Sequence, residues 1–235
     1  MSIFSISDIH LPASGKSEKS MDIFGERWRS HREKIENNWK RVVSDDDTVI
    51  LPGDISWALT LDEARDDFIF INSLPGKKII GKGNHDFWWT SLSKMNAALA
   101  EWECGSIRFL RGGAESVENT AVAMTCGKFP SEGESEADFL RLSRCEATRL
   151  DTALTAANEK SDCGRTIVFL HYPVYYMGAV NEPIFDVICS HGVTEVYYGH
   201  IHGGYGAPAV TEYRGVRFHL VSADYLGFCP TLVRT

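Results

Sequence analysis

Aspartate, asparagine and histidine side chains recur along this chain at the ends of short apolar runs, where no packing role explains them. Seven of them offer oxygen or imidazole-nitrogen donors: Asp8, His10, Asp54, Asn84, His171, His200 and His202. Oxygen and imidazole donors without sulfur suit Mn, Fe or Zn better than Ca or Cu(I). Seven ligands are too many for one tetrahedral ion, but they suit two divalent ions that share one carboxylate. Asp54 is the candidate for that shared carboxylate.

The spacing of the donors agrees with a pair of ions. Asp8 and His10 are two residues apart, so they would point to the same face of an extended chain. His200 and His202 have the same spacing, which separates them by roughly 6–7 Å along a strand. Each histidine could then reach its own ion of a pair about 3.5–4 Å apart, the arrangement that supports in-line displacement at phosphorus.

Strands and helices alternate along the chain, and the donors follow the strands. Apolar or alternating runs predict strands at residues 3–7, 48–51, 77–80, 107–110, 120–125, 166–170, 193–198 and 216–223. Apolar stripes and capping signals predict helices at residues 30–43, from Thr60 onward, at 90–102, at 135–159, and from Pro183 to a stop at Gly192. This alternation predicts a layered α/β (α+β) domain in which some later strands pair antiparallel. Sites in such folds lie beyond the carboxyl ends of the strands, where the donors fall.

Composition limits the classes of function. The 235 residues suffice for a single domain spanning residues 1–235 with a sizeable core. The net charge of −8 argues against a protein that coats nucleic acid through a basic face. No apolar run approaches the ~20 residues that span a bilayer, and the first predicted strand begins where a signal peptide would lie, so we expect a cytoplasmic protein without membrane contact. The oligomeric state stays open.

The six cysteines form no C-x-x-C pair, so a zinc knuckle or thioredoxin-like motif has no support. A chain of this length does not need disulfides. We therefore expect buried free thiols.

Together, the polar clusters resemble the motifs of the calcineurin-like metallophosphoesterase family. The family order of D-x-H, GD, GNH with D or E, a lone H and GHxH is matched by Asp8-Ile9-His10, Gly53-Asp54, Gly83-Asn84-His85-Asp86, His171 and Gly199-His200-Ile201-His202. The resemblance implies a two-sheet mixed β-sandwich flanked by helices. It implies that the first ion is held by Asp8, His10 and His202, and the second ion by Asn84, His171 and His200. Asp54 would bridge the two ions. Mn is the favoured metal, with Fe or Zn as alternatives.

The family resemblance also implies a reaction. A metal-bound hydroxide would attack phosphorus in line in a small phosphodiester or phosphomonoester, and His85 would assist the leaving-group oxygen without binding metal. Gly83 would permit the tight turn of its motif. The stretch after Asp54 lacks the second Asp and the Arg of the GDxxDRG motif of serine/threonine protein phosphatases, which disfavours that subgroup. The group that orients His85 is therefore open, with Asp86 as one candidate.

Two rival functions remain to be weighed. A catalytically weak or inactive scaffold of the same fold would lack ligands, and none is missing here. A metal-dependent amide hydrolase would carry H-x-H on an early strand, whereas here it comes last.

Other segments have two interpretations. Residues 11–28 form either a solvated loop or a lid over the site. Trp57, Trp88 and Trp89 pack in the core or form an aromatic pocket wall, with the core favoured. We expect a solvated helix face, rather than phosphate contacts, for Arg141, Arg144 and Arg149. We expect structural or exposed positions for His31, His191 and His219.

Overall fold

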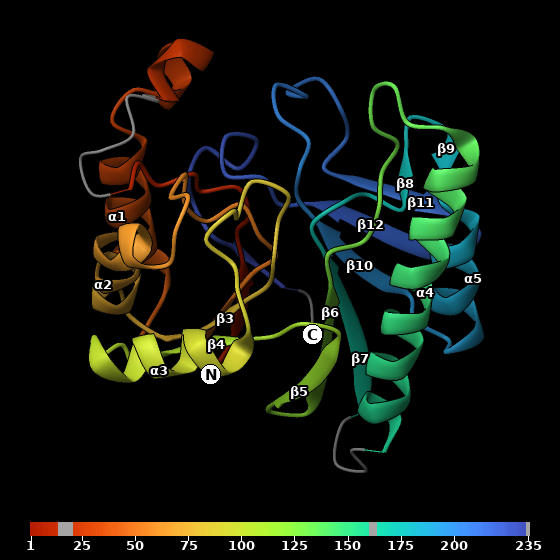
Figure 1. Ribbon diagram of the computed structural model, residues 1–235, viewed down its shortest axis with the longest axis horizontal. Coiled ribbons are helices and arrows are strands. Elements are labelled where there is room, and N and C mark those ends of the chain that lie inside the picture. The colour runs from red at the N-terminus through yellow and green to blue at the C-terminus, as the bar shows by residue number, and fades with distance from the viewer. Residues whose placement is uncertain (14–20, 160–163, 234–235) are drawn as a thin grey trace.

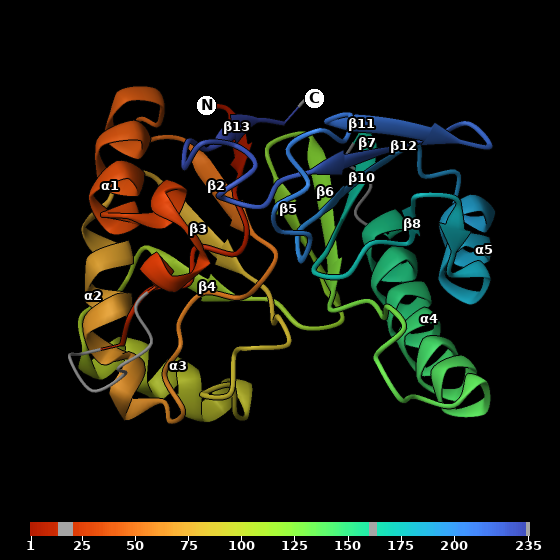
Figure 2. The same ribbon diagram turned by 90° about the horizontal axis from the view of Figure 1, so that it is seen from above.

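Two large β-sheets lie face to face in the computed structural model of the protein, which describes residues 1–13, 21–159 and 164–233. Helices cover the outer side of each sheet, so the layers run helix, sheet, sheet, helix (Figure 1, Figure 2). This confirms the layered α/β domain predicted from the alternation of strands and helices, and the two-sheet arrangement that the family resemblance implies.

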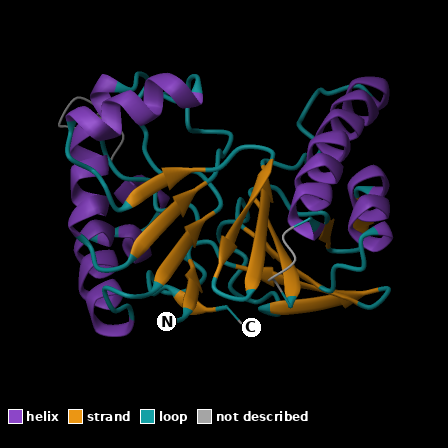
Figure 3. Ribbon diagram, turned by 90° about the horizontal axis from the view of Figure 1, so that it is seen from below, coloured by secondary structure: helices purple, strands orange, loops and turns teal. Residues whose placement is uncertain are grey.

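The first sheet is almost entirely parallel. Its strand order is β13 (Thr231–Leu232), β1 (Ile3–Ser5), β2 (Thr48–Leu51), β3 (Lys77–Ile80) and β4 (Ile107–Phe109). Only β13 runs antiparallel to its neighbour, β1. This pairing brings the two ends of the described chain together, as seen from below in Figure 3.

The second sheet is parallel at its centre and antiparallel at both edges. Its order is β11 (Val210–Tyr213), β12 (Val216–Leu220), β10 (Glu195–Tyr198), β7 (Arg165–Leu170), β6 (Thr120–Thr125) and β5 (Gly113–Val117). Strands β11 and β5 are the antiparallel edges, as expected for segments that no helix separates from their partners. A small hairpin joins β8 (Tyr175–Tyr176) to β9 (Ala179–Val180).

Five α-helices cover the sheets in the described part of the chain, and some of them begin at side-chain caps. Outside the first sheet lie α1 (His31–Val42), α2 (Arg65–Ser73), which follows the 3₁₀ turn η3 (Asp62–Ala64), and α3 (Leu92–Glu101). Outside the second sheet lie α4 (Glu136–Asn158) and α5 (Glu182–Ser190). Ser135 caps α4 by accepting a bond from the backbone N–H of Asp138. Thr60 and Glu63 form the predicted capping box, each side chain accepting from the other's backbone N–H.

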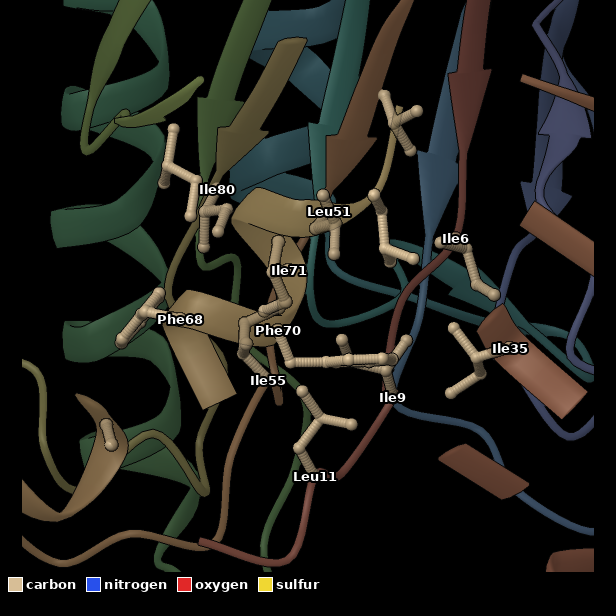
Figure 4. Close-up of a cluster of buried hydrophobic side chains, with 14 of the residues drawn as sticks. Ile6, Ile9, Leu11, Ile35, Leu51, Ile55, Phe68, Phe70, Ile71 and Ile80 are labelled. Atoms are coloured by element: carbon tan, nitrogen blue, oxygen red, sulfur yellow. The ribbon is translucent and has the colours of Figure 1, made fainter. Parts of the chain in front are cut away.

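Each central strand is buried on both faces, because it separates a helix layer from the other sheet. In β7, Val168 and Leu170 pack toward the helices, whereas Ile167 and Phe169 pack between the sheets. The first sheet repeats this alternation, and Figure 4 shows the cluster on its helix side. Burial on both faces explains why these strands are continuous apolar runs.

The predictions from sequence missed the weakest strands and were wrong about the burial of most described cysteines. Strand β5 lies between the predicted strands 107–110 and 120–125, where no strand was expected, because its Gly, Ala, Glu and Ser residues carry little strand signal. The short strands β8, β9, β11 and β13 were also missed. The five described cysteines are free thiols, as expected, but only Cys104 is buried. Cys126 and Cys229 are partly buried, and Cys145 and Cys189 are exposed, so the expectation of burial is wrong for them. Cys163 lies outside the described residues.

The segment 11–28 contains two short 3₁₀ helices, Met21–Phe24 and Glu26–Trp28. Residues 14–20 lie outside the described part of the chain, so the lid stays a prediction. Among the described residues, no helix combines the length and the apolar character that crossing a membrane requires.

Replacing Phe169 by Ala should destabilise the fold strongly. Phe169 is fully buried between the sheets and stacks on Tyr197, with ring centroids 5.2 Å apart. The lost burial and the cavity should lower the free energy of unfolding by about 3–5 kcal/mol in chemical denaturation. Met177→Ala, at a side chain 86% exposed, should change it by less than about 0.5 kcal/mol. Equal effects in the two variants would contradict this account of the core.

Candidate metal centre

The two sheets join at the carboxyl ends of their strands. Ser7, just after β1, forms a parallel bridge with Ser222, just after β12. The N–H of Ser7 donates to the Val221 carbonyl at 2.8 Å, and the N–H of Ala223 donates to the Ser7 carbonyl at 2.8 Å. The loops that follow the strands of both sheets therefore lie at one edge of the molecule's two sheets, and all seven predicted ligands come together there.

The first group of ligands comprises Asp8, His10 and His202. The Nε2 atoms of His10 and His202 lie 3.2 Å apart, and Nε2 of His202 lies 3.4 Å from Oδ1 of Asp8. One donor atom from each residue fits within 4.8 Å of the others, which is close enough to hold one ion. His202 is partly exposed, so this group reaches the surface.

The second group comprises Asn84, His171 and His200. Oδ1 of Asn84 lies 2.7 Å from Nε2 of His171 and 3.1 Å from Nδ1 of His200. Two histidines from separate loops thus converge on the amide oxygen of Asn84, which comes from a third loop.

Asp54 lies between the two groups. Its Oδ2 atom is 3.7 Å from Nε2 of His10 and 3.6 Å from Nε2 of His171. Asp8, Asp54 and His171 form a second set whose donor atoms lie within 4.8 Å of one another. One carboxylate oxygen therefore lies about equally far from a histidine of each group, as a bridging ligand would.

The protonation of the histidines suits metal binding. Burial lowers the pKa of His171 to about 3 and that of His200 to about 4, and it holds the pKa of His10 well below its ordinary value. These imidazoles are neutral at pH 7 and have a lone pair to donate. Burial also lowers the pKa of His202, but its hydrogen bonds to Asp224 and Asp8 outweigh that and raise it to about 10, so an ion there would displace a proton.

The carboxylates also favour a cation. Burial raises the pKa of Asp54, and the neighbouring charges of Asp8 and Asp86 raise it further. No lysine or arginine in the described ranges forms an ion pair with Asp8 or Asp54. A divalent ion would offset this buried negative charge, so the residues present fit the metals that the family resemblance implies.

Tight backbone geometry holds the ligands in place. Asp8, His10, Asp54 and His200 all have positive φ angles, between 42° and 69°. The strands end before these residues, so the expectation of an extended chain at Asp8–His10 and at His200 is wrong. Left-handed backbone is unfavourable for residues with a side chain, and it concentrates at functional sites.

Three motif glycines allow close approach of the loops. A Cβ atom on Gly83 would lie 2.1 Å from Oδ1 of Asp54, and one on Gly199 would lie 2.2 Å from Oδ2 of Asp8. A Cβ on Gly53 would meet the backbone N of Gly83 at 2.3 Å. The turn expected to require Gly83 has no positive φ there, so space for Asp54, not φ, explains this glycine.

Asp86 fixes the backbone around Asp54. Its Oδ2 accepts the N–H groups of Asp54 and Gly83, each at 2.8 Å. Its Oδ1 accepts the N–H of Ile55 at 2.8 Å and the Nε1–H of Trp88 at 3.0 Å. Asp86 therefore holds the backbone of the Gly53-Asp54 motif against the backbone of its own motif, Gly83-Asn84-His85-Asp86. Asp86 as the group that orients His85 stays a prediction.

Asp224 is a functional residue that the sequence did not reveal. Its Oδ1 lies 2.9 Å from Nδ1 of His202, and its Oδ2 accepts the N–H of Gly203 and the hydroxyl of Tyr205, each at 3.0 Å. A carboxylate behind a ligating histidine fixes the orientation of the ring. The only sequence signal was an aspartate just after the last predicted strand.

Two further residues support the first ligand group. Oγ of Ser222 donates to Oδ2 of Asp8 at 3.1 Å. Nε2 of His31 lies 3.1 Å from the carbonyl oxygen of His10, so His31 is structural, as expected.

His85 lies beside the ligands at the wall of a pocket. Its N–H donates to Oδ1 of Asp54 at 2.8 Å, and its ring lies 4.8 Å from that of Trp57, which stacks on His10 at 4.7 Å. The pocket measures about 290 Å³, and we name it the aromatic pocket. Its lining residues are His10, Met21, Phe24, Trp28, Trp57, His85, His202, Gly203, Tyr205 and Asp224.

The three tryptophans near the motifs thus divide. Trp88 and Trp89 are buried in the core, as favoured, and Trp57 is only partly buried and forms a pocket wall.

Gly83→Ala should abolish metal binding. The added methyl group would displace the Asp54 carboxylate, so we expect far less than the wild-type ion content by elemental analysis after loading and gel filtration. Gly105→Ala is the matched control, because nothing lies within 4 Å of its Cβ position. A fully loaded Gly83→Ala variant would contradict the close-approach argument.

Asp224→Asn should weaken metal binding without removing a ligand. Loss of the carboxylate behind His202 should raise the dissociation constant for Mn by about 10–100-fold in a calorimetric titration. Asp151→Asn is the matched control. Oδ1 of Asp151 lies 2.8 Å from Nε2 of His191, a similar carboxylate–histidine pair away from the site, so this variant should leave the affinity unchanged. Equal affinities in wild type and Asp224→Asn would show that Asp224 does not support the centre.

Solved structures share this architecture at low sequence identity. The protein TT1561 of Thermus thermophilus aligns with a TM-score of 0.58 and 14% identity over 99% of this chain and 97% of its own. Phosphopantetheinyl hydrolase from Mycobacterium tuberculosis aligns with a TM-score of 0.53 and 15% identity over 99% and 95%. A protein of unknown function from Aquifex aeolicus aligns with a TM-score of 0.53 and 14% identity over 98% and 95%. At these identities the likeness shows the fold.

The family is shown by the sequence itself. No match to this chain is found among curated proteins. The family model for calcineurin-like phosphoesterases, however, matches residues 1–204, which include every motif described above. The chain therefore belongs to the calcineurin-like phosphoesterase family and is a metal-dependent phosphoester hydrolase.

Proposed function

We propose that this protein hydrolyses small phosphodiesters or phosphomonoesters with two divalent ions bound at the ligand cluster. The observation that carries the proposal is the position of Asp54, whose Oδ2 lies 3.7 Å from His10 and 3.6 Å from His171. Asp8, His10 and His202 would hold one ion, Asn84, His171 and His200 the other, and Asp54 both.

Two ions at this place would supply an activated water for in-line attack and would neutralise charge on the phosphoryl oxygens. The chain's own residues supply position and protonation state. Burial keeps His10, His171 and His200 neutral, and Asp224 orients His202. Mn is the favoured ion, with Fe or Zn as alternatives, because the donors are oxygen and imidazole nitrogen.

His85 is the proposed catalytic residue. Its backbone is tied to Asp54, so its ring is held in register with the ligands while it faces the aromatic pocket. A histidine there can donate a proton to the departing oxygen of the ester. Two sets of described residues have donor atoms close enough to hold one ion, and neither set includes His85. This agrees with a role for His85 that is separate from metal binding.

The aromatic pocket would receive the organic group of the substrate. Trp57 and Trp28 offer apolar ring surfaces beside His85 and His202, and a volume of about 290 Å³ suits a small molecule. One structural neighbour is named a phosphopantetheinyl hydrolase, and a phosphoester with an extended organic group agrees with a pocket of this kind. A cytoplasmic location and a single domain remain predictions.

His85→Ala should keep both ions and lose about 10²–10⁴-fold in turnover, because general acid assistance disappears while the ligands stay. The assay uses p-nitrophenyl phosphate and bis(p-nitrophenyl) phosphate with Mn, and elemental analysis gives the ion content. His191→Ala, at a histidine outside the site, is the matched control and should change neither.

Asp54→Ala should lose metal as well as turnover, and full activity in it would disprove the bridging assignment. Wild-type protein that binds two ions but turns over neither ester would support the alternative function, a catalytically weak or inactive scaffold of this fold.

A further inference from the structure

A second pocket, lined mainly by cations, lies against helix α4. It measures about 390 Å³, and five basic side chains line it: Lys82, Arg111, Lys128, Arg141 and Arg149. Glu146 is the only carboxylate among its lining residues. The chain as a whole carries a net charge of −8, so this concentration of positive charge is unusual for the molecule. We name it the basic pocket.

The positive charge of the basic pocket is only partly offset. Arg149 pairs with Glu146, Lys128 with Glu134 at 2.8 Å, and Arg141 with Asp138 at 3.4 Å. Lys82 and Arg111 have no ion-pair partner in the parts of the chain that the structure describes. Five cations against three carboxylates leave a local charge of +2, and the two unpaired cations lie at the strand ends rather than on the helix.

The basic pocket adjoins the second ligand group. Lys82 stands two residues before Asn84. On the opposite wall, the carbonyl of Cys126 accepts the N–H of Tyr172 at 2.9 Å, and Tyr172 directly follows His171. The walls of the pocket are therefore continuous with the backbone that carries Asn84 and His171. The aromatic pocket, in contrast, is lined by His10, His202 and His85.

We propose that the basic pocket binds a second phosphate group of the same substrate, so that the enzyme prefers phosphoesters with two phosphates. Guanidinium and ammonium groups are the side chains that bind phosphate best. A hollow of this size takes a compact anion, whereas an acidic protein partner would need an extended basic face. The inference rests on the proposed function, because it assumes that the first phosphate reacts at the ligand cluster. It also revises the expectation for α4, since Arg141 and Arg149 line the pocket and only Arg144 does not.

Alkanediol bisphosphates of increasing length test the proposal and measure the span between the two sites. The wild-type enzyme loaded with Mn should have a kcat/KM about tenfold higher for the bisphosphate long enough to reach both sites than for the alkyl monophosphate of equal length. Charged hydrogen bonds to one additional phosphate stabilise binding by about that factor. Lys82→Ala and Arg111→Ala should bring this ratio close to one. Arg144→Ala, on α4 but outside the pocket, should keep the wild-type ratio. Absence of a bisphosphate preference at every length would overturn the proposal.

A footprint without turnover separates this proposal from the proposed function. Phenylglyoxal modification of Arg111, followed by mass spectrometry, should fall by about tenfold in saturating inorganic pyrophosphate, while modification of Arg144 should not change. Lys82→Ala should weaken this protection. Protection of Arg111 in a protein that hydrolyses no ester would keep the anion site and refute the proposed function. Hydrolysis without protection of Arg111 would refute the anion site alone, and protection only by an acidic polypeptide would point to a protein partner instead.

Discussion

Buried negative charge is the constraint on which the rest of this structure depends. Asp8, Asp54, Asp86 and Asp224 are each at most 1% exposed and all lie where the two sheets meet. A buried carboxylate is stable only when donors or cations surround it. Asp86 and Asp224 are satisfied by backbone N–H groups and by side chains of Trp88, His202 and Tyr205. Asp8 and Asp54 have imidazoles and a few N–H groups around them, so they are the two carboxylates that bound ions would neutralise.

The fold maintains this arrangement at the cost of local strain. Four ligands adopt left-handed backbone, which costs about 1–2 kcal/mol for a residue with a side chain. The apolar neighbours of the ligands offset that cost, because Ile9, Leu11 and Ile55 are buried in the core beside Asp8, His10 and Asp54 (Figure 4). The close approach of Gly83 to Asp54 and of Gly199 to Asp8 then fixes the loops relative to one another. The loops of the site are thereby anchored in both sheets.

The two pockets adjoin different groups of ligands. The aromatic pocket lies at the first ligand group and His85, whereas the basic pocket lies beside the second group. A substrate that fills both would place its apolar part beside the first ligand group and its anionic part beside the second. Specificity would then come from side chains that bind no metal, such as Trp57 at one end and Arg111 at the other.

The amino-acid sequence by itself determined the strong strands, the long helices and the seven candidate ligands, because apolar periodicity and motif order can be read along the chain without knowledge of packing. It could not reveal β5, whose residues carry little strand signal, or β13, which pairs with β1 at the other end of the chain. Only the tertiary structure decided that Asp86 holds the backbone of Asp54, that Asp224 supports His202, and that Lys82, Arg111 and α4 enclose one pocket. Each of these depends on contacts between residues distant in sequence, and a single sequence carries no record of such distances.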